Sequence, residues 1–83
     1  MVVPSIRAGR WRLVVIPGDH EPRHIHARLG TRDASEAVIR LNADGTVTLR
    51  EADRGLSRAE VRQALVIVLE HFDRLSELWE RYC

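Results

Sequence analysis

The sequence predicts an α+β fold in which a small antiparallel β-meander of three to five strands carries one long C-terminal helix on one face. Short segments between residues 2 and 51 alternate polar and apolar residues, and turn signals separate them. After residue 57 the apolar residues instead recur every three or four positions. We expect a single domain over residues 1–83, because 83 residues leave no room for a second core.

The predicted sheet spans residues 2–51. A short first strand covers residues 2–6, and a turn with Gly9 at its tip leads into a largely buried strand over residues 10–16. Pro17 and Gly18 end that strand. Strict alternation predicts further strands over residues 24–30 and 35–41. The segment "NADG" at 42–45 is a hairpin turn, and its second strand covers residues 46–51.

The predicted helix covers about residues 57–82. Ser57 and Glu60 have the spacing of a capping box, which marks its start. One apolar face then follows at steps of four and three: Val61, Leu65, Val68, Phe72, Leu75, Trp79 and Tyr82. Further apolar residues widen this face in the first half of the helix: Ala64, Val66, Ile67 and Leu69. Either the rest of the chain covers this surface, or a dimer or partner interface does.

Burial of the helix against the sheet assigns two faces to the strands. The face toward the helix carries Trp11, Leu13, Val15, Ile25, Ala27, Leu29, Ala37, Ile39, Leu41, Val47 and Leu49. By alternation, the opposite face carries Arg12, Val14, Ile16, His24, His26, Arg28, Glu36, Val38, Arg40, Thr46, Thr48 and Arg50. Four arginines and two histidines against one glutamate predict that this second face is basic.

Composition restricts the classes of function. The net charge is only +1, yet every one of the 13 basic residues is arginine, and guanidinium groups bind phosphates and carboxylates through two hydrogen bonds. Cys83 is the only cysteine, which excludes an intramolecular disulfide and a cysteine-based zinc site. No segment resembles a signal peptide or reaches transmembrane length. We therefore expect a soluble cytoplasmic protein without a membrane partner.

Three of the four histidines fall within the segment "DHEPRHIHARLG" at residues 19–30. His24 and His26 are two apart on a predicted strand, so both rings leave the same face, and His20 lies in the preceding loop. One interpretation is a divalent-metal centre formed by His20, His24, His26 and Asp19. Imidazole ligands favour zinc or nickel. An enzyme of this kind would be a metal-dependent hydrolase.

A second interpretation is acid–base catalysis on RNA without a metal, as in a metal-independent endoribonuclease. Histidines titrate near neutral pH, and arginines stabilise charge that develops on phosphorus. The residues with these roles would be His24 and His26 for proton transfer, Arg28 and Arg40 for charge stabilisation, and Arg12 and Arg50 for substrate binding. The face lacks aromatic residues for base stacking, which counts against a sequence-reading RNA-binding module. A third interpretation is that the histidines are ordinary surface residues, buried in a homodimer or exposed.

Around these histidines the sequence resembles a family of short bacterial proteins known as domain of unknown function 4160. Their pattern is close to Asp/Glu-His-x-Pro-Pro-His-x-His, followed by an "EAxI" strand and a helix that ends in a Leu-x-x-x-Trp element. This chain has "DHEPRHIH", "SEAVI" and "LSELW" in that order, with Arg23 in place of the second proline and a longer, more polar segment, "READRGLSRAE", before the helix.

The resemblance implies a toxin-like component of a bacterial two-gene module of the toxin–antitoxin type. Such a protein would act on RNA and be neutralised by a small cognate protein partner. A non-catalytic antitoxin or interaction module is the alternative that the resemblance leaves open.

Overall fold

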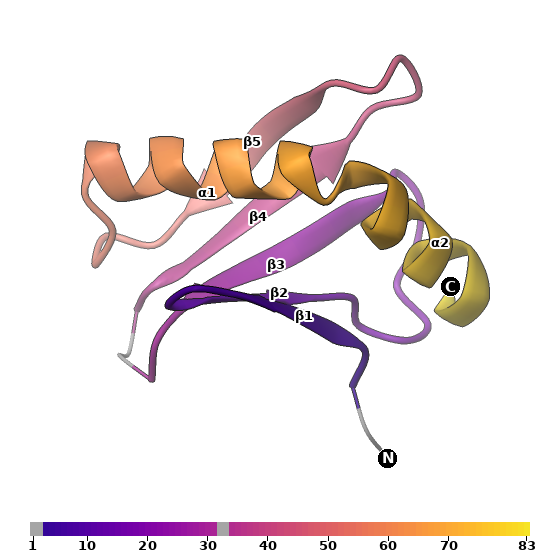
Figure 1. Ribbon diagram of the computed structural model, residues 1–83, viewed down its shortest axis with the longest axis horizontal. Helices are drawn as coiled ribbons and strands as arrows, with labels where there is room; N and C mark the ends of the chain where they lie inside the picture. Colours follow the sequence, from indigo (N-terminus) through magenta and orange to yellow (C-terminus); the bar gives the residue numbers. More distant parts are fainter. Residues whose placement is uncertain (1–2, 32–33) are drawn as a thin grey trace.

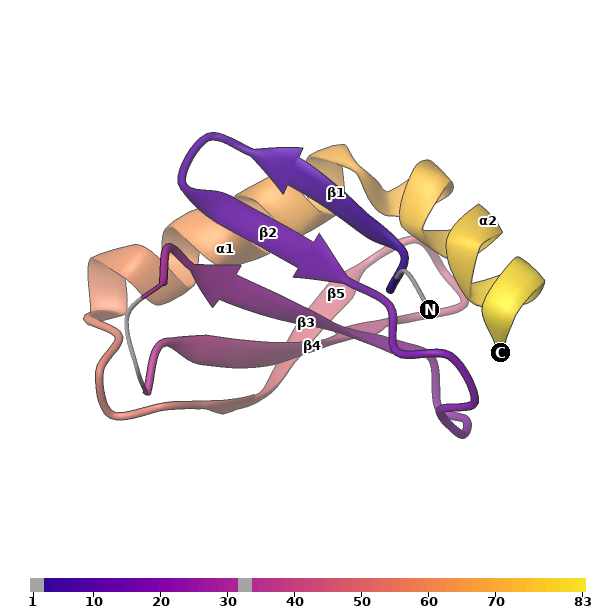
Figure 2. The same cartoon turned by 90° about the horizontal axis from the view of Figure 1, so that it is seen from below.

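A computed structural model describes residues 3–31 and 34–83. Five antiparallel strands form one sheet in chain order, namely β1 (Ser5–Ala8), β2 (Trp11–Val14), β3 (His24–Leu29), β4 (Glu36–Leu41) and β5 (Val47–Ala52). Helices α1 (Arg58–Glu70) and α2 (Phe72–Tyr82) follow. Helix α1 crosses one face of the sheet, and α2 continues beyond it to the start of β3 (Figures 1 and 2). The predicted α+β meander is confirmed, with five strands.

Tight turns join the outer strands to the sheet. Ala8 pairs with Trp11 across a two-residue turn, in which Gly9 adopts a φ of 61° that residues with a Cβ atom rarely adopt. The first strand thus covers residues 5–8 rather than 2–6, and Val2 lies outside the described residues. In the β4–β5 turn, Thr46 donates hydrogen bonds from its hydroxyl and its backbone N–H to Asp44. These bonds lower the pKa of the Asp44 carboxyl.

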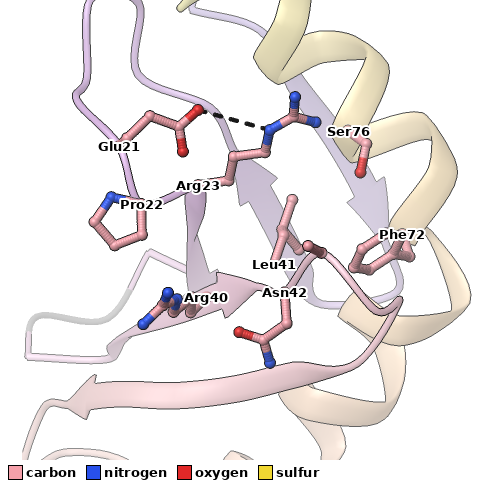
Figure 3. Close-up of a pocket in the computed structure, with 9 residues that line it drawn as sticks. Glu21, Pro22, Arg23, Arg40, Leu41, Asn42, Phe72 and Ser76 are labelled. Atoms are coloured by element: carbon pink, nitrogen blue, oxygen red, sulfur yellow. Dashed lines mark ion pairs between the residues drawn. The ribbon is translucent and has the colours of Figure 1, made fainter.

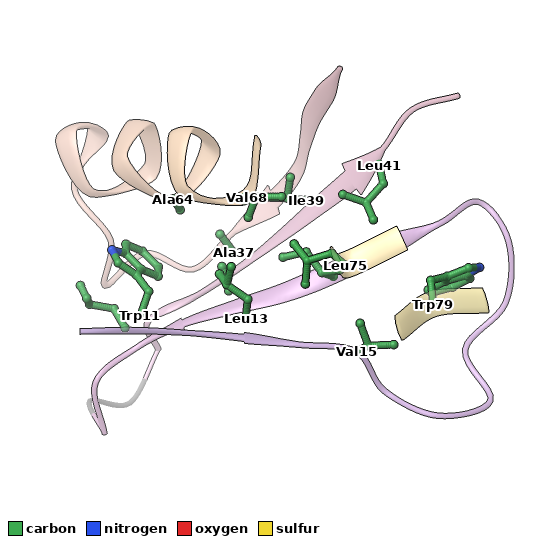
Figure 4. Packing of buried hydrophobic residues seen from close by; sticks show 13 residues of the cluster. Trp11, Leu13, Val15, Ala37, Ile39, Leu41, Ala64, Val68, Leu75 and Trp79 are labelled. Atoms are coloured by element: carbon green, nitrogen blue, oxygen red, sulfur yellow. The ribbon is translucent and has the colours of Figure 1, made fainter. Parts of the chain in front are cut away.

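The core lies between the sheet and the two helices (Figure 4). Nine of the inward residues predicted from the sequence lie on β2, β3 and β4 or, for Val15, directly after β2. All nine are buried: Trp11, Leu13, Val15, Ile25, Ala27, Leu29, Ala37, Ile39 and Leu41. The helices bury Ala64, Val68, Leu75 and Trp79 against them. Leu49 has the predicted inward position, since it pairs with the buried Ile39. The prediction that Leu49 itself is buried is wrong. Its side chain is 37% exposed because β5 is an edge strand.

The single helix predicted after residue 57 is in fact two helices that meet at His71. The φ and ψ angles of His71 are −105° and 18°, outside the helical range. Its ring Nδ1 lies 2.9 Å from the carbonyl oxygen of Ile67, where it competes with the backbone ladder. Beyond this bend, α2 turns toward the start of β3 (Figure 1), and Leu75 and Trp79 remain in the core.

Helix α1 begins where the sequence predicts. The Ser57 hydroxyl accepts a hydrogen bond from the Glu60 N–H (3.1 Å), and the Glu60 carboxylate accepts one from the Ser57 N–H (2.8 Å). On the outer surface of α1, Val66 and Leu69 are 57% and 50% exposed, so this apolar surface is left uncovered by the described residues. Neither helix in the described part of the chain has the length and apolar character needed to cross a bilayer.

Candidate metal centre

The site begins with two histidines on the central strand. Ile25, Ala27 and Leu29 are buried against the helices, and this fixes the orientation of β3. Because successive side chains of a strand leave opposite faces, His24 and His26 both leave the face away from α1. The structure therefore confirms the shared face that the alternation predicted.

Apolar residues surround both imidazole rings. His26 pairs with Val14 on β2 and Val38 on β4, whose side chains are both buried. The ring of His24 lies 5.3 Å from the ring of Trp79, because α2 reaches around the end of the sheet at this point. The side chains of His24 and His26 are only 10% and 15% exposed. These are not freely solvated surface histidines.

The loop between β2 and β3 carries Asp19 and is tied to α2 at two points. The backbone N–H of Gly18 donates to the carbonyl oxygen of Tyr82 (3.1 Å). Four residues after Asp19, the guanidinium of Arg23 donates to the carboxylate of Glu80 (3.2 Å). Both contacts use the last turn of α2, so the end of the chain sets the path of this loop over the histidine face.

The carboxylate of Asp19 meets both histidines. Its Oδ2 lies 3.0 Å from Nε2 of His24 and 3.3 Å from Nε2 of His26. These three donor atoms all lie within 4.8 Å of one another. Two atoms that are each about 2.1 Å from one ion are about 3.0 Å apart at a right angle and about 3.4 Å apart at the tetrahedral angle. The two distances from the Asp19 oxygen to the imidazole nitrogens therefore fit pairs of ligands on a shared divalent ion.

The outer nitrogen of each histidine faces an acceptor. Nδ1 of His24 lies 2.8 Å from the carbonyl oxygen of Pro22, which can only accept, so this nitrogen carries the proton. In the neutral ring, Nε2 then presents its lone pair to Asp19. Nδ1 of His26 makes no hydrogen bond within the described residues; Oε1 of Glu36, which accepts a 2.8 Å hydrogen bond from Arg28, lies 3.5 Å from it. Histidines that bind metals are usually oriented in this way by a carbonyl or a carboxylate.

His20 does not join this group. Its side chain is exposed, and among the described residues the atoms that converge belong to Asp19, His24 and His26. Sequence reasoning included Asp19 but did not assign a role to Glu36 beside His26. A signal existed, since alternation places Glu36 on the histidine face. The carbonyl of Pro22 and the ring of Trp79 gave no such signal, because their positions depend on the loop path and on the bend at His71.

The basic character predicted for this face is weaker in the structure because β5 departs from strict alternation. Ile39 pairs with Leu49, but Val38 pairs with Glu51, so the register shifts by one residue between them. Glu51 thereby takes the position opposite Val38, and Arg50 has no directly opposed residue on β4. A carboxylate thus occupies the place on the face that alternation gave to an arginine.

The four arginines assigned to this face lie at different places on it. All of them are exposed: Arg12, Arg28, Arg40 and Arg50. Arg28 is two residues from His26 and bound to Glu36. Arg12 lies directly opposite Arg28, and Arg40 lies directly opposite His24. The structure therefore brings Arg28 and Arg40 next to the histidines and leaves Arg50 on the edge strand.

A groove of about 400 Å³ lies beside the cluster, between the loop before β3, the end of β4 and α2 (Figure 3). Arg23 lies in this groove, with its guanidinium 3.8 Å from the carboxylate of Glu21. The guanidinium of Arg40 points away from Phe72 and Ser76, which line the opposite wall. The cationic groups of this groove do not converge on one point, so the group of Asp19, His24 and His26 is the better defined site.

Fold and site together define a class: a small α+β protein with two histidines and one aspartate gathered on the face of its sheet opposite α1. Residues 11–80 match the family model described as Domain of unknown function (DUF4160). The chain belongs to this family, as its histidine motif predicted. A search of curated proteins and a search of solved structures each found no match.

Proposed function

We propose that the protein binds a divalent transition-metal ion through Asp19, His24 and His26. The observation that carries this proposal is the convergence of one carboxylate oxygen and two Nε2 atoms within 4.8 Å. Two imidazoles and one carboxylate suit zinc, nickel or ferrous iron better than magnesium or calcium. Three protein ligands leave a coordination position for water or substrate, which is the arrangement of a catalytic rather than a structural centre.

Bound protons explain the same contacts less well. Because Nδ1 of His24 is protonated, its Nε2 can approach a carboxylate oxygen at 3.0 Å only if a second proton or a cation lies between them. His26 is different, because its Nδ1 makes no hydrogen bond within the described residues, so a proton on Nε2 alone also accounts for its 3.3 Å contact with Asp19. One metal ion satisfies all three donor atoms.

The test is a melting curve of the untagged protein with added zinc and with a chelator. An ion that binds only the folded state stabilises it by about 2.7 kcal/mol at a free concentration 100 times Kd, so zinc should raise the wild-type Tm. His26→Ala should lose this response, while His20→Ala, which lies outside the group of three, should keep it. A wild-type Tm indifferent to zinc, nickel and chelator, with no metal in elemental analysis, would contradict the proposal.

Catalysis on RNA by the histidines without a metal is the second candidate function. The observation that favours it is the position of Arg40 directly opposite His24, with Arg28 two residues from His26. The carboxylate of Asp19 against both Nε2 atoms speaks against it, because it occupies the position that a phosphate would need. In this reading the protein is a toxin-like component that a small partner neutralises.

Expression in a bacterium separates the two candidates. A metal-independent ribonuclease should arrest growth and degrade RNA, and His24→Ala or His26→Ala should relieve the arrest. Its activity in vitro should survive a chelator, whereas a metal-dependent hydrolase should lose activity. Harmless expression with intact RNA would remove the toxin-like function and favour an interaction module, for which the exposed Val66 and Leu69 offer a surface.

A further inference from the structure

A row of arginines crosses three strands of the sheet next to the metal centre. Arg7 on β1 pairs directly with Arg12 on β2, and Arg12 pairs directly with Arg28 on β3. Arg10, in the turn between β1 and β2, joins them around a cavity of about 160 Å³ that Trp11 also lines. We call these four arginines the arginine row.

The arginine row has little negative charge to balance it. All four side chains are exposed, and among the described residues the only ion pair that they make joins Arg28 to Glu36. Within residues 3–31 and 34–83, Arg7, Arg10 and Arg12 make no ion pair. Like charges directly opposite each other destabilise an antiparallel pair, and here two successive pairs repeat that arrangement. Stability of the fold therefore does not explain the row, whereas an anionic ligand does.

The surroundings of the row indicate the kind of anion. Trp11 is only 2% exposed and donates its indole N–H to Gln63, so its ring is not available for base stacking. Gly30 and Thr31, which line the same cavity, carry no apolar side chain that would insert into a lipid surface. The ligand must therefore be held by its phosphates alone. Adjacent strands are about 4.8 Å apart, so the row spans about 10 Å, which is enough for two or three phosphates of one strand.

We propose that the arginine row binds the phosphodiester backbone of a single-stranded RNA, without reading its sequence. Guanidinium groups bind phosphate oxygens through two parallel hydrogen bonds, and three of them in line follow a backbone. Arg28 is also two residues from His26 on the same face of β3, so a phosphate on the row lies beside the metal ligands. The proposal does not require a metal, and the binding is measured in the presence of a chelator.

The experiment measures fluorescence anisotropy of a short, labelled single-stranded RNA of mixed sequence at several salt concentrations. With about three phosphate contacts, log K should fall against log salt with a slope of about −2. The double variant Arg7→Gln/Arg12→Gln should bind at least about tenfold more weakly at low salt, with a slope near −0.7. The matched control, Arg54→Gln/Arg74→Gln, removes the same charge from exposed positions elsewhere and should bind like wild type.

Circular dichroism of both double variants checks that the sheet is intact. Absence of RNA binding at low salt overturns the proposal, as does an equal loss in the control variant, which would show a general effect of charge. Tighter binding to double-stranded RNA, or to vesicles rich in phosphatidylserine, would assign the row to a different partner and also overturns it. RNA binding without any response to zinc would leave the arginine row in place and remove only the metal centre.

Discussion

Replacing Trp79 with alanine should lower the free energy of unfolding by about 3–5 kcal/mol. Trp79 is 3% exposed, lies in the core with Leu75, and also packs against the ring of His24. Its removal leaves a cavity at the junction of α2 and the sheet, which so small a core cannot refill. Urea unfolding followed by circular dichroism measures the change without relying on tryptophan fluorescence, to which Trp11 also contributes.

Tyr82→Ala is the matched control, since it removes an aromatic ring from the same helix. The side chain of Tyr82 is 41% exposed, and its contact with the loop uses only the backbone carbonyl, so the loss should be about 1 kcal/mol or less. If both variants lowered the free energy of unfolding by the same small amount, Trp79 would lie outside the core, and the packing of α2 described above would be contradicted.

Asp19→Asn should weaken zinc binding by about 100-fold or more. The amide keeps the shape of the side chain but removes the charge that faces both Nε2 atoms. Loss of a group that only orients a ligand costs about 10–100-fold in affinity, and loss of a ligand should cost at least the upper end of that range. Glu36→Gln, beside Nδ1 of His26, should therefore have a smaller effect, of about tenfold.

Competition with a chromophoric chelator gives these affinities directly. Glu21→Gln removes an exposed carboxylate from the same loop, outside the group of three, and should leave the affinity unchanged. An Asp19→Asn affinity equal to that of Glu21→Gln would show that Asp19 is not a ligand. The order wild type, Glu36→Gln, Asp19→Asn, from tight to weak, is the expected result.

Local patterns in the sequence predict most of the fold. Alternation identifies the buried residues of β2, β3 and β4, and Ser57 with Glu60 marks the start of α1, because both signals depend on near neighbours. The end of α1 is different. The apolar spacing continues through His71 without interruption, while the backbone of His71 leaves the helical conformation and its ring Nδ1 lies against the carbonyl oxygen of Ile67. The register shift opposite Val38 is equally absent from the alternation of β5.

In the candidate site, too, local sequence patterns predict some features and miss others. The common face of His24 and His26 follows from their spacing on a strand. The choice of Asp19 rather than His20 as the third member of the group does not, because it depends on how the loop runs over the sheet. That path is set by contacts with residues more than fifty positions away, at Glu80 and Tyr82, which no local pattern in the loop encodes.

These two contacts make the proposed metal centre sensitive to a part of the chain that holds none of its three candidate ligands. Helix ends open more readily than helix centres, and opening of the last turn of α2 would release Gly18 and Arg23, and with them Asp19. If the protein binds a metal as proposed, the coupling is reciprocal: whatever stabilises that turn would tighten metal binding, and bound metal would stabilise the turn by the same free energy. A protein that docks on the end of α2 would therefore control the metal affinity from a distance, as an allosteric effector.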